Sequence, residues 1–224
     1  MFVGHYGVSY GAKAVEQRVP LWIFFVAVQF LDVLWAIFVL LGIEKVRIVP
    51  GITATNPLDL YYMPYTHGLP GALLCSVIAA VLYHVWIGRS DGGRGSVLVG
   101  VAVFSHWLLD LLVHRPDLPL WADRYKVGLS LWNYPVLAFT LEALALFAGT
   151  WLYLRSTRRT AKAGTAGFVL FGFGLLLVQA MTFFGSPPTS ATAAAVTALV
   201  AYAGVAAVAA WLERKRNPHP TPSP

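Results

Sequence analysis

The sequence predicts an all-α polytopic membrane protein with about six transmembrane helices and one short N-terminal helix. Of its 224 residues, 58% are hydrophobic and only 12% are charged. A soluble domain of this size carries about 25% charged residues. Several apolar runs also reach the roughly 20 residues that cross a bilayer as a helix. The single cysteine, Cys75, excludes an intrachain disulfide and a cysteine-based metal cluster.

Six apolar stretches are long enough to form spanning helices. They cover residues 21–42, 67–87, 96–114, 129–154, 166–184 and 191–212. Pro116 ends the third, and the Gly-Ser-Pro-Pro sequence at 185–188 turns the chain between the last two. Residues 3–17 are too short to span, so this segment either re-enters the membrane beside the first span or lies outside it.

The charged loops predict an orientation. With six spans both termini lie on one side, and that side carries eleven of the Lys and Arg residues against five on the other. The positive-inside rule therefore predicts a multi-pass protein of the bacterial inner (plasma) membrane with both termini in the cytoplasm. Trp86, Trp151 and Trp211 fall near the same interface, as an aromatic belt requires. Membrane topology thus accounts for the net charge of +6, and we expect no nucleic-acid partner.

The ionisable residues inside the spans divide the chain into three parts. Residues 1–155 contain nearly all of them and form the predicted metal-site core. Residues 156–212 form two apolar helices, and the Ala- and Gly-rich last span suits close packing against a partner protein or a second copy. Residues 213–224 are basic and then proline-rich, which is typical of a disordered tail.

The third span carries an unusual polar stripe. His106, Asp110 and His114 are spaced at i, i+4 and i+8, so they lie above one another on one helix face. Each such group costs about 2–3 kcal/mol or more near the bilayer centre when it faces lipid. Another part of the protein must therefore cover this face.

Depth counting places other ionisable residues at the same level. With a rise of about 1.5 Å per residue, five groups lie about 15–21 Å from the cytoplasmic face. They are His5, Asp32, His106, Asp110 and Glu142, and His67 reaches toward them from the outer end of its span. Each residue alone is explained by packing or by a neighbouring charge. Ionisable residues with unrelated roles would lie at different depths. The shared depth of this set therefore predicts one buried site.

The residue types in this layer are those that bind zinc or a similar divalent ion. His nitrogens and carboxylate oxygens are zinc ligands, and manganese and iron also accept them. The candidate ligands are His5, Asp32, His67, His106 and Asp110. Glu142 and His114 are candidates for catalytic proton transfer. These residues are compatible with two arrangements: one ion with a bound water, or two ions about 3.5–4 Å apart.

Polar residues toward the outer boundary are candidates for contacts with a substrate. They are Tyr65, Arg115, Asp117 and Asn133. Arg115 either receives an anionic head group or neutralises Asp117. The expected partner is a membrane lipid, since the site lies at bilayer depth.

Four short motifs resemble a bacterial family of inner-membrane proteins regarded as metal-dependent hydrolases. They are Gly4-His5, Leu31-Asp32, Thr66-His67 and Ser105-His106-Trp107-Leu108-Leu109-Asp110, within residues 1–155. That family is distantly similar to zinc-dependent phospholipase C. In this chain Leu34 replaces the second carboxylate of the Pro-Asp-x-Asp pattern, and tyrosines at 61–65 replace a His-Arg pair. Both differences favour one ion over two.

The resemblance and the layer together predict a metal-dependent hydrolase that acts on a lipid phosphoester at the outer leaflet. Three alternatives use the same residues differently. The layer suits transport of a metal ion or protons, and two of its histidines suit haem binding. The last two helices suit a non-catalytic assembly protein.

Overall fold

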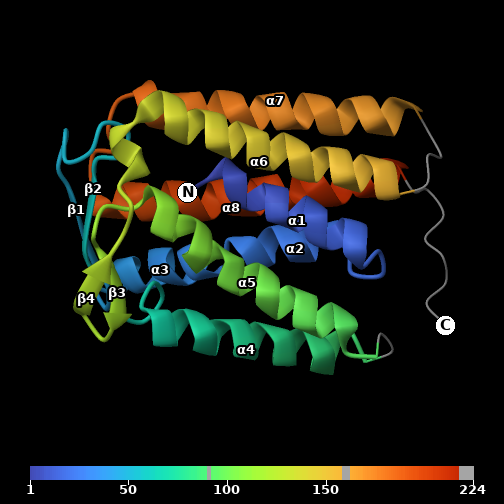
Figure 1. Ribbon diagram of the computed structural model, residues 1–224, viewed down its shortest axis with the longest axis horizontal. Coiled ribbons are helices and arrows are strands. Elements are labelled where there is room, and N and C mark those ends of the chain that lie inside the picture. The colour runs from blue at the N-terminus through green and yellow to red at the C-terminus, as the bar shows by residue number, and fades with distance from the viewer. Residues whose placement is uncertain (90–91, 158–161, 217–224) are drawn as a thin grey trace.

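The computed structural model describes residues 1–89, 92–157 and 162–216, and these form an all-α polytopic membrane protein (Figure 1). The helices are α1 (Val3–Val15), α2 (Leu21–Val28), α3 (Phe30–Leu40), α4 (Leu69–Trp86), α5 (Arg94–Val113), α6 (Pro135–Ser156), α7 (Lys162–Phe184) and α8 (Ala191–Arg216), with a short 3-10 turn η1 (Leu131–Asn133). Five of these helices are long and apolar enough to span a membrane, or six if the bent pair α2–α3 is one span. The predicted fold class is confirmed.

The first predicted span is broken in the middle. Helices α2 and α3 meet at Gln29 at a bend of 52°. At the break the Gln29 amide donates to the carbonyl of Val26 instead of continuing the i−4 pattern. The break leaves the carbonyl of Val28 available to a side chain of another helix. This local irregularity directly shapes the site described below.

Two β-hairpins close one end of the bundle, which the sequence did not predict (Figure 1). Strands β1 (Lys45–Ile48) and β2 (Leu58–Tyr62) pair antiparallel, and so do β3 (Leu118–Trp121) and β4 (Arg124–Val127). The predicted start of the fourth span at residue 129 is wrong, because α6 begins at Pro135. A proline favours the first helical turn and keeps the residue before it, Tyr134, out of helical geometry.

Helix α1 is a buried half-helix. It starts inside the bundle and runs toward the end opposite the hairpins (Figure 1), packed against α2, α5 and α6. Its contact with α6 is backbone to backbone, because a Cβ on Gly7 would lie 2.2 Å from the carbonyl oxygen of Ala145. Gly149 meets Gly7 in the same way, at 2.1 Å. Of the two arrangements open from the sequence, the structure has the one in which this segment lies inside the bundle.

Helix α8 is longer than its predicted span. It continues to Arg216, and Glu213 forms an ion pair with Lys13 of α1 at 2.7 Å. The predicted start of a disordered tail at residue 213 is therefore wrong. The tail beyond residue 216 lies outside the described residues.

Candidate metal centre

The polar stripe of α5 forms the centre of the site. His106, Asp110 and His114 are all buried, with exposed fractions of 0%, 2% and 3%. The carboxylate oxygen Oδ2 of Asp110 lies 3.0 Å from Nε2 of His106 and 3.4 Å from Nε2 of His114. The spacing along one helix face thus places both rings on one carboxylate.

Three further segments bring their ionisable residues to this stripe. From α1, Nε2 of His5 lies 3.2 Å from Oδ1 of Asp110. The α-amino group of Met1 also contacts this oxygen. From α3, Oδ1 of Asp32 lies 3.5 Å from Nε2 of His106. His67, which precedes α4, lies 3.3 Å from Asp32 and 3.6 Å from Asp110 through its Nε2. All five predicted metal ligands therefore meet in one place.

Two overlapping groups of these side chains can hold a metal ion. They are His5, His106 and Asp110, and Asp32, His67 and His106. Four of the nitrogen-to-oxygen distances, between 3.3 and 3.6 Å, exceed the usual length of an N–H···O hydrogen bond. Two ligand atoms on one tetrahedral zinc ion lie about 3.3–3.6 Å apart, given bond lengths of about 2.0–2.2 Å. The spacing fits side chains around a shared ion better than direct hydrogen bonds.

In two of the inward-facing rings, those of His106 and His114, the second nitrogen is held by an acceptor outside the cluster. Nδ1 of His106 donates to the Val28 carbonyl freed by the α2–α3 bend, at 2.6 Å. Nδ1 of His114 donates to Oδ1 of Asp117 at 2.8 Å. In both rings the hydrogen then sits on Nδ1, and in the neutral ring Nε2 offers its lone pair to the cluster. Metal-binding histidines in proteins are oriented in this way.

His67 is oriented by a chain of two further groups. The Thr66 hydroxyl donates to Oε2 of Glu44 at 2.6 Å, so it can only accept from Nδ1 of His67, 2.8 Å away. The other oxygen of Glu44 accepts the backbone amides of Tyr65 and Thr66 at 2.8 and 2.9 Å. Glu44 is 1% exposed. It therefore fixes the backbone and the ring tautomer of His67 together.

Nε2 of His106 is the most informative atom of the cluster. It is fully buried and, among the described residues, has no hydrogen-bond partner. It lies between carboxylate oxygens of Asp32 and Asp110. A lone pair facing two carboxylates in a buried space is unfavourable unless the ring takes a second proton or a cation lies between them.

Glu142 lies at the cluster but is engaged by other groups. Its Oε2 accepts the backbone amides of Phe2 and Gly4 at the start of α1, at 2.8 and 3.2 Å. Its Oε1 accepts the side-chain amide of Gln179 from α7 at 3.0 Å. Glu142 thus caps the N-terminus of α1, where a carboxylate complements the helix dipole. These bonds occupy the oxygens that the predicted catalytic role requires.

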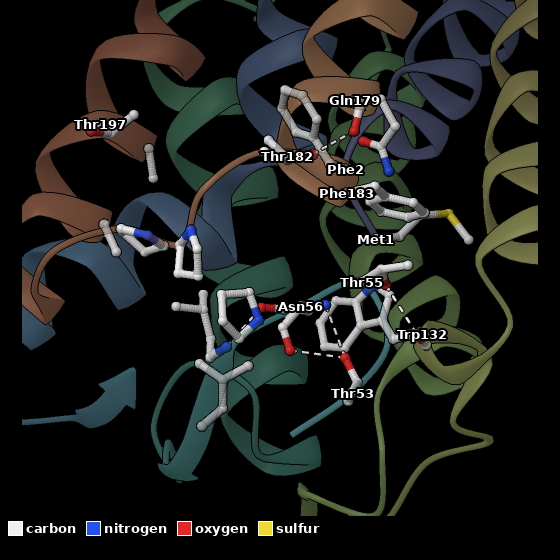
Figure 2. Close-up of a pocket in the computed structure, with 18 of the residues that line it drawn as sticks. Met1, Phe2, Thr53, Thr55, Asn56, Trp132, Gln179, Thr182, Phe183 and Thr197 are labelled. Atoms are coloured by element: carbon white, nitrogen blue, oxygen red, sulfur yellow. Dashed lines mark hydrogen bonds between the residues drawn. The ribbon is translucent and has the colours of Figure 1, made fainter. Parts of the chain in front are cut away.

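A cavity of about 730 Å³ leads to the cluster (Figure 2). Asp32, His67, Asp110, His114 and Glu142 line its inner part. Figure 2 shows Thr53 to Asn56 of the β1–β2 loop opposite Gln179, Thr182 and Phe183 of α7. The predicted ligands and both predicted proton-transfer residues therefore surround the cavity or lie directly behind it.

The four predicted substrate contacts lie elsewhere in the structure. Within the described residues, none of Tyr65, Arg115, Asp117 and Asn133 lines the cavity. Arg115 pairs with Asp59 and Asp117, and Tyr65 and Asn133 are exposed. Asp117 orients His114 instead. Counting position along the chain cannot show which way a loop side chain turns, and within the described residues none of these four lines the cavity.

The site also contains residues that the sequence analysis missed. Tyr202 of α8 donates to Oδ2 of Asp32 at 2.6 Å, and Gln179 of α7 bonds to Glu142. These contacts bring the last two helices into a site expected within residues 1–155. Gln179 is the single amide in the apolar run of α7, which is the signal that could have identified it.

Comparison with models of known protein families, with curated proteins and with solved structures found no match. The likeness to inner-membrane hydrolases therefore rests on the four short motifs alone.

Proposed function

We propose that this protein is a membrane-embedded metal-dependent hydrolase with one divalent ion, and that this ion is zinc. Asp32, His67, His106 and Asp110 would hold the ion, with His5 beside it. The observation that carries this proposal is the buried Nε2 of His106, which lacks a hydrogen-bond partner among the described residues and faces two carboxylates. A cation at this point would satisfy all three groups.

The cavity supports hydrolysis over simple ion storage. A bound divalent ion lowers the pKa of a coordinated water toward neutrality. His114 lines the cavity, and its Nδ1 is bonded to Asp117. An imidazole oriented by a carboxylate is a common general base or acid. We therefore assign proton transfer to His114 and assign Glu142 to holding α1.

The proposed substrate is a phosphoester of a membrane lipid. The cavity is formed in part by α7 and α8, two helices that can span a membrane. The motif likeness favours phosphoester chemistry. With the termini on the cytoplasmic side, as the basic residues indicate, the hairpin end of the bundle would face the outer leaflet.

Metal analysis of the purified protein tests the proposal. We expect about one zinc, manganese or iron ion per chain. His106→Ala should abolish retention of the ion, whereas His84→Ala should not, because His84 is exposed on α4, away from the cluster. A wild-type protein that is metal-free after purification, and that gains no thermal stability from added ions, would contradict the proposal.

Hydrolysis is tested with defined probes. Phosphatidylglycerol and phosphatidic acid in mixed micelles, and bis(p-nitrophenyl) phosphate in solution, supply lipid and soluble phosphoesters. We expect turnover of a lipid probe that chelation removes and that Asp110→Asn lacks. A metal-loaded protein that cleaves none of the three would overturn the assignment to this reaction class.

A further inference from the structure

The cavity extends well beyond the metal cluster. Its inner part carries the His, Asp and Glu side chains, and its outer part is bounded by α3, the β1–β2 loop, α7 and α8. The apolar lining of this outer part includes Trp35, Phe183 and Ala198. The volume of about 730 Å³ falls within the range of about 300–1,000 Å³ that is typical of small-molecule sites.

The cavity opens sideways between α7 and α8. Val178 and Met181 of α7 line it and are 42% and 67% exposed. Thr182 of α7 and Thr197 of α8 also line it and are exposed. Residues that both line a cavity and face outward mark its openings. One opening therefore lies in the gap between these two helices, and a second lies at the loop end, where Pro50, Ala54 and Ser186 also line the cavity and are exposed.

The opening between α7 and α8 lies within the length of two candidate membrane spans. Val178 is six residues before the end of α7, and Thr197 is six residues after the start of α8. At about 1.5 Å per residue, both lie about 9 Å inside their helices. Beside Thr182 and Thr197, exposed apolar side chains flank the gap, among them Val196 and Val200 at 45% and 67% exposed. A molecule entering here comes from the hydrocarbon of the membrane.

We propose that the outer part of the cavity binds the acyl chain of a membrane phospholipid, which enters laterally between α7 and α8. A water-soluble ligand would have to cross hydrocarbon to use the opening between the helices, at a cost in desolvation of its polar groups, and would enter from the loop end instead. An acyl chain carries no such groups. Small residues on one face of α8, Ala194, Ala198 and Ala201, leave room for it.

The two ends of the cavity then match the two ends of a lipid. The chain lies against Trp35 and Phe183, and the polar linkage lies near Asp32 and His114. Tyr202 lines the passage between these ends and is bonded to Asp32. Only the position of the linkage rests on the proposed function. Binding of the chain requires neither the ion nor turnover.

Photo-crosslinking in nanodiscs tests the proposal directly. The probe is phosphatidylglycerol with a diazirine at the end of one acyl chain, and labelled residues are mapped by mass spectrometry. Annular lipid labels every exposed apolar side chain, so the informative residues are Trp35 and Phe183, at 5% and 9% exposed. We expect about fivefold more label there than on Phe24 and Phe168, which are fully buried elsewhere in the core. Equal labelling of the two pairs would overturn the proposal.

Two neighbouring residues of α8 provide a matched pair of variants. Thr197 lines the opening between the helices and Val196 does not, although both are exposed and nearly equal in size. Thr197→Trp should fill the gap and reduce labelling of Phe183 about fivefold, and Val196→Trp should leave it unchanged. If both variants or neither reduce the label, the chain does not enter by this route.

The failure of this inference and that of the proposed function are distinguishable. His106→Ala, which should lack the ion, is expected to show the same labelling of Trp35 and Phe183 as the wild type. In the wild type, labelling without any bound metal would sustain the lipid site and refute the metal-dependent hydrolase. Bound metal without labelling of these two residues would refute the lipid site alone.

Discussion

Two polar clusters lie inside this bundle, one at each end of α1, and they differ in how their charges are satisfied. At the C-terminal end, Nζ of Lys13 lies 2.7 Å from Oε1 of Glu213 and donates to the carbonyls of Gln17 and Val19 at 2.7 and 2.8 Å. The other oxygen of Glu213 accepts the amide of Leu21 at 2.8 Å. Each charge here has an opposite charge and hydrogen bonds, all supplied by the protein.

The cluster at the N-terminal end of α1 lacks this balance. The carboxylates of Asp32 and Asp110 face one another across Nε2 of His106, which has no hydrogen-bond partner among the described residues. The α-amino group of Met1 supplies a positive charge at Oδ1 of Asp110, whereas Oδ2 of Asp110 and Oδ1 of Asp32 both face Nε2 of His106. A buried polar cluster that is complete indicates a structural role, and one that leaves a buried polar atom without a partner indicates a ligand site.

His114→Gln should separate catalysis from metal binding at the N-terminal cluster. Glutamine cannot transfer a proton, so turnover of the lipid probe should fall about 10²–10⁴-fold while the ion is retained. The measurement is the initial rate alongside metal content. His84→Gln, an exposed histidine changed in the same way, is the control and should match the wild type. Loss of the ion in His114→Gln would instead identify this residue as a ligand.

Lys13→Met should affect only the cluster at the C-terminal end of α1, and so should lower stability without changing metal binding. It leaves Glu213, which is 14% exposed, without its charge partner, and we expect a cost of about 3 kcal/mol in the free energy of unfolding. Thermal denaturation in detergent measures the loss, and metal content should stay at the wild-type level. The double variant with Glu213→Gln should recover part of the stability, because no unpaired charge is then buried. Metal loss comparable to that of His106→Ala would show that the two clusters are not independent.

Glu44→Gln tests whether metal binding depends on the orientation of His67 by Glu44, which lies outside the cluster. The amide can no longer accept both backbone bonds and the Thr66 hydroxyl, so the Nδ1 hydrogen of His67 is less firmly placed. Removing such an outer partner typically weakens metal affinity about 10–100-fold. Competition with a chelator of known affinity measures it. An unchanged affinity would assign Glu44 to holding the loop only.

The contrast also explains what could be predicted from the sequence. The stripe on α5 and the shared depth of His5 and Asp32 follow from helix geometry, and the structure places these residues next to one another. Helix counting could not show the break at Gln29, because the break depends on contacts with other helices. Side chains beyond the helices, such as Glu44 and Asn133, turn according to loop geometry, which has no period to count.

The contribution of Tyr202 was hidden for a related reason. Its helix is almost uniformly small and apolar, so the sequence indicates packing and gives no register relative to Asp32. The tertiary contact between α8 and α3 sets that register. For a site to which several helices contribute, the sequence therefore predicts how deep each residue lies in the bundle more readily than the direction in which its side chain points.

The smallest expected effect concerns Glu16, at the same end of the bundle as Lys13. Nε and Nη2 of Arg18 donate to its two oxygens at 2.9 and 3.0 Å. These hydrogen bonds lower the pKa of the Glu16 carboxyl below its ordinary value. A lowered folded-state pKa contributes stability above the unfolded value of about 4.3, and this stability is lost as pH falls through the folded value.

Glu16→Gln should therefore cost less than about 1 kcal/mol at neutral pH, since Arg18 is 56% exposed and water screens the pair. The difference in melting temperature from the wild type should be largest above about pH 4.3 and should shrink as the pH falls further. Metal content should not change. A difference that grows on acidification would mean that the charge of Glu16 opposes folding, in which case the balance at this end of α1 rests on Lys13 and Glu213 alone.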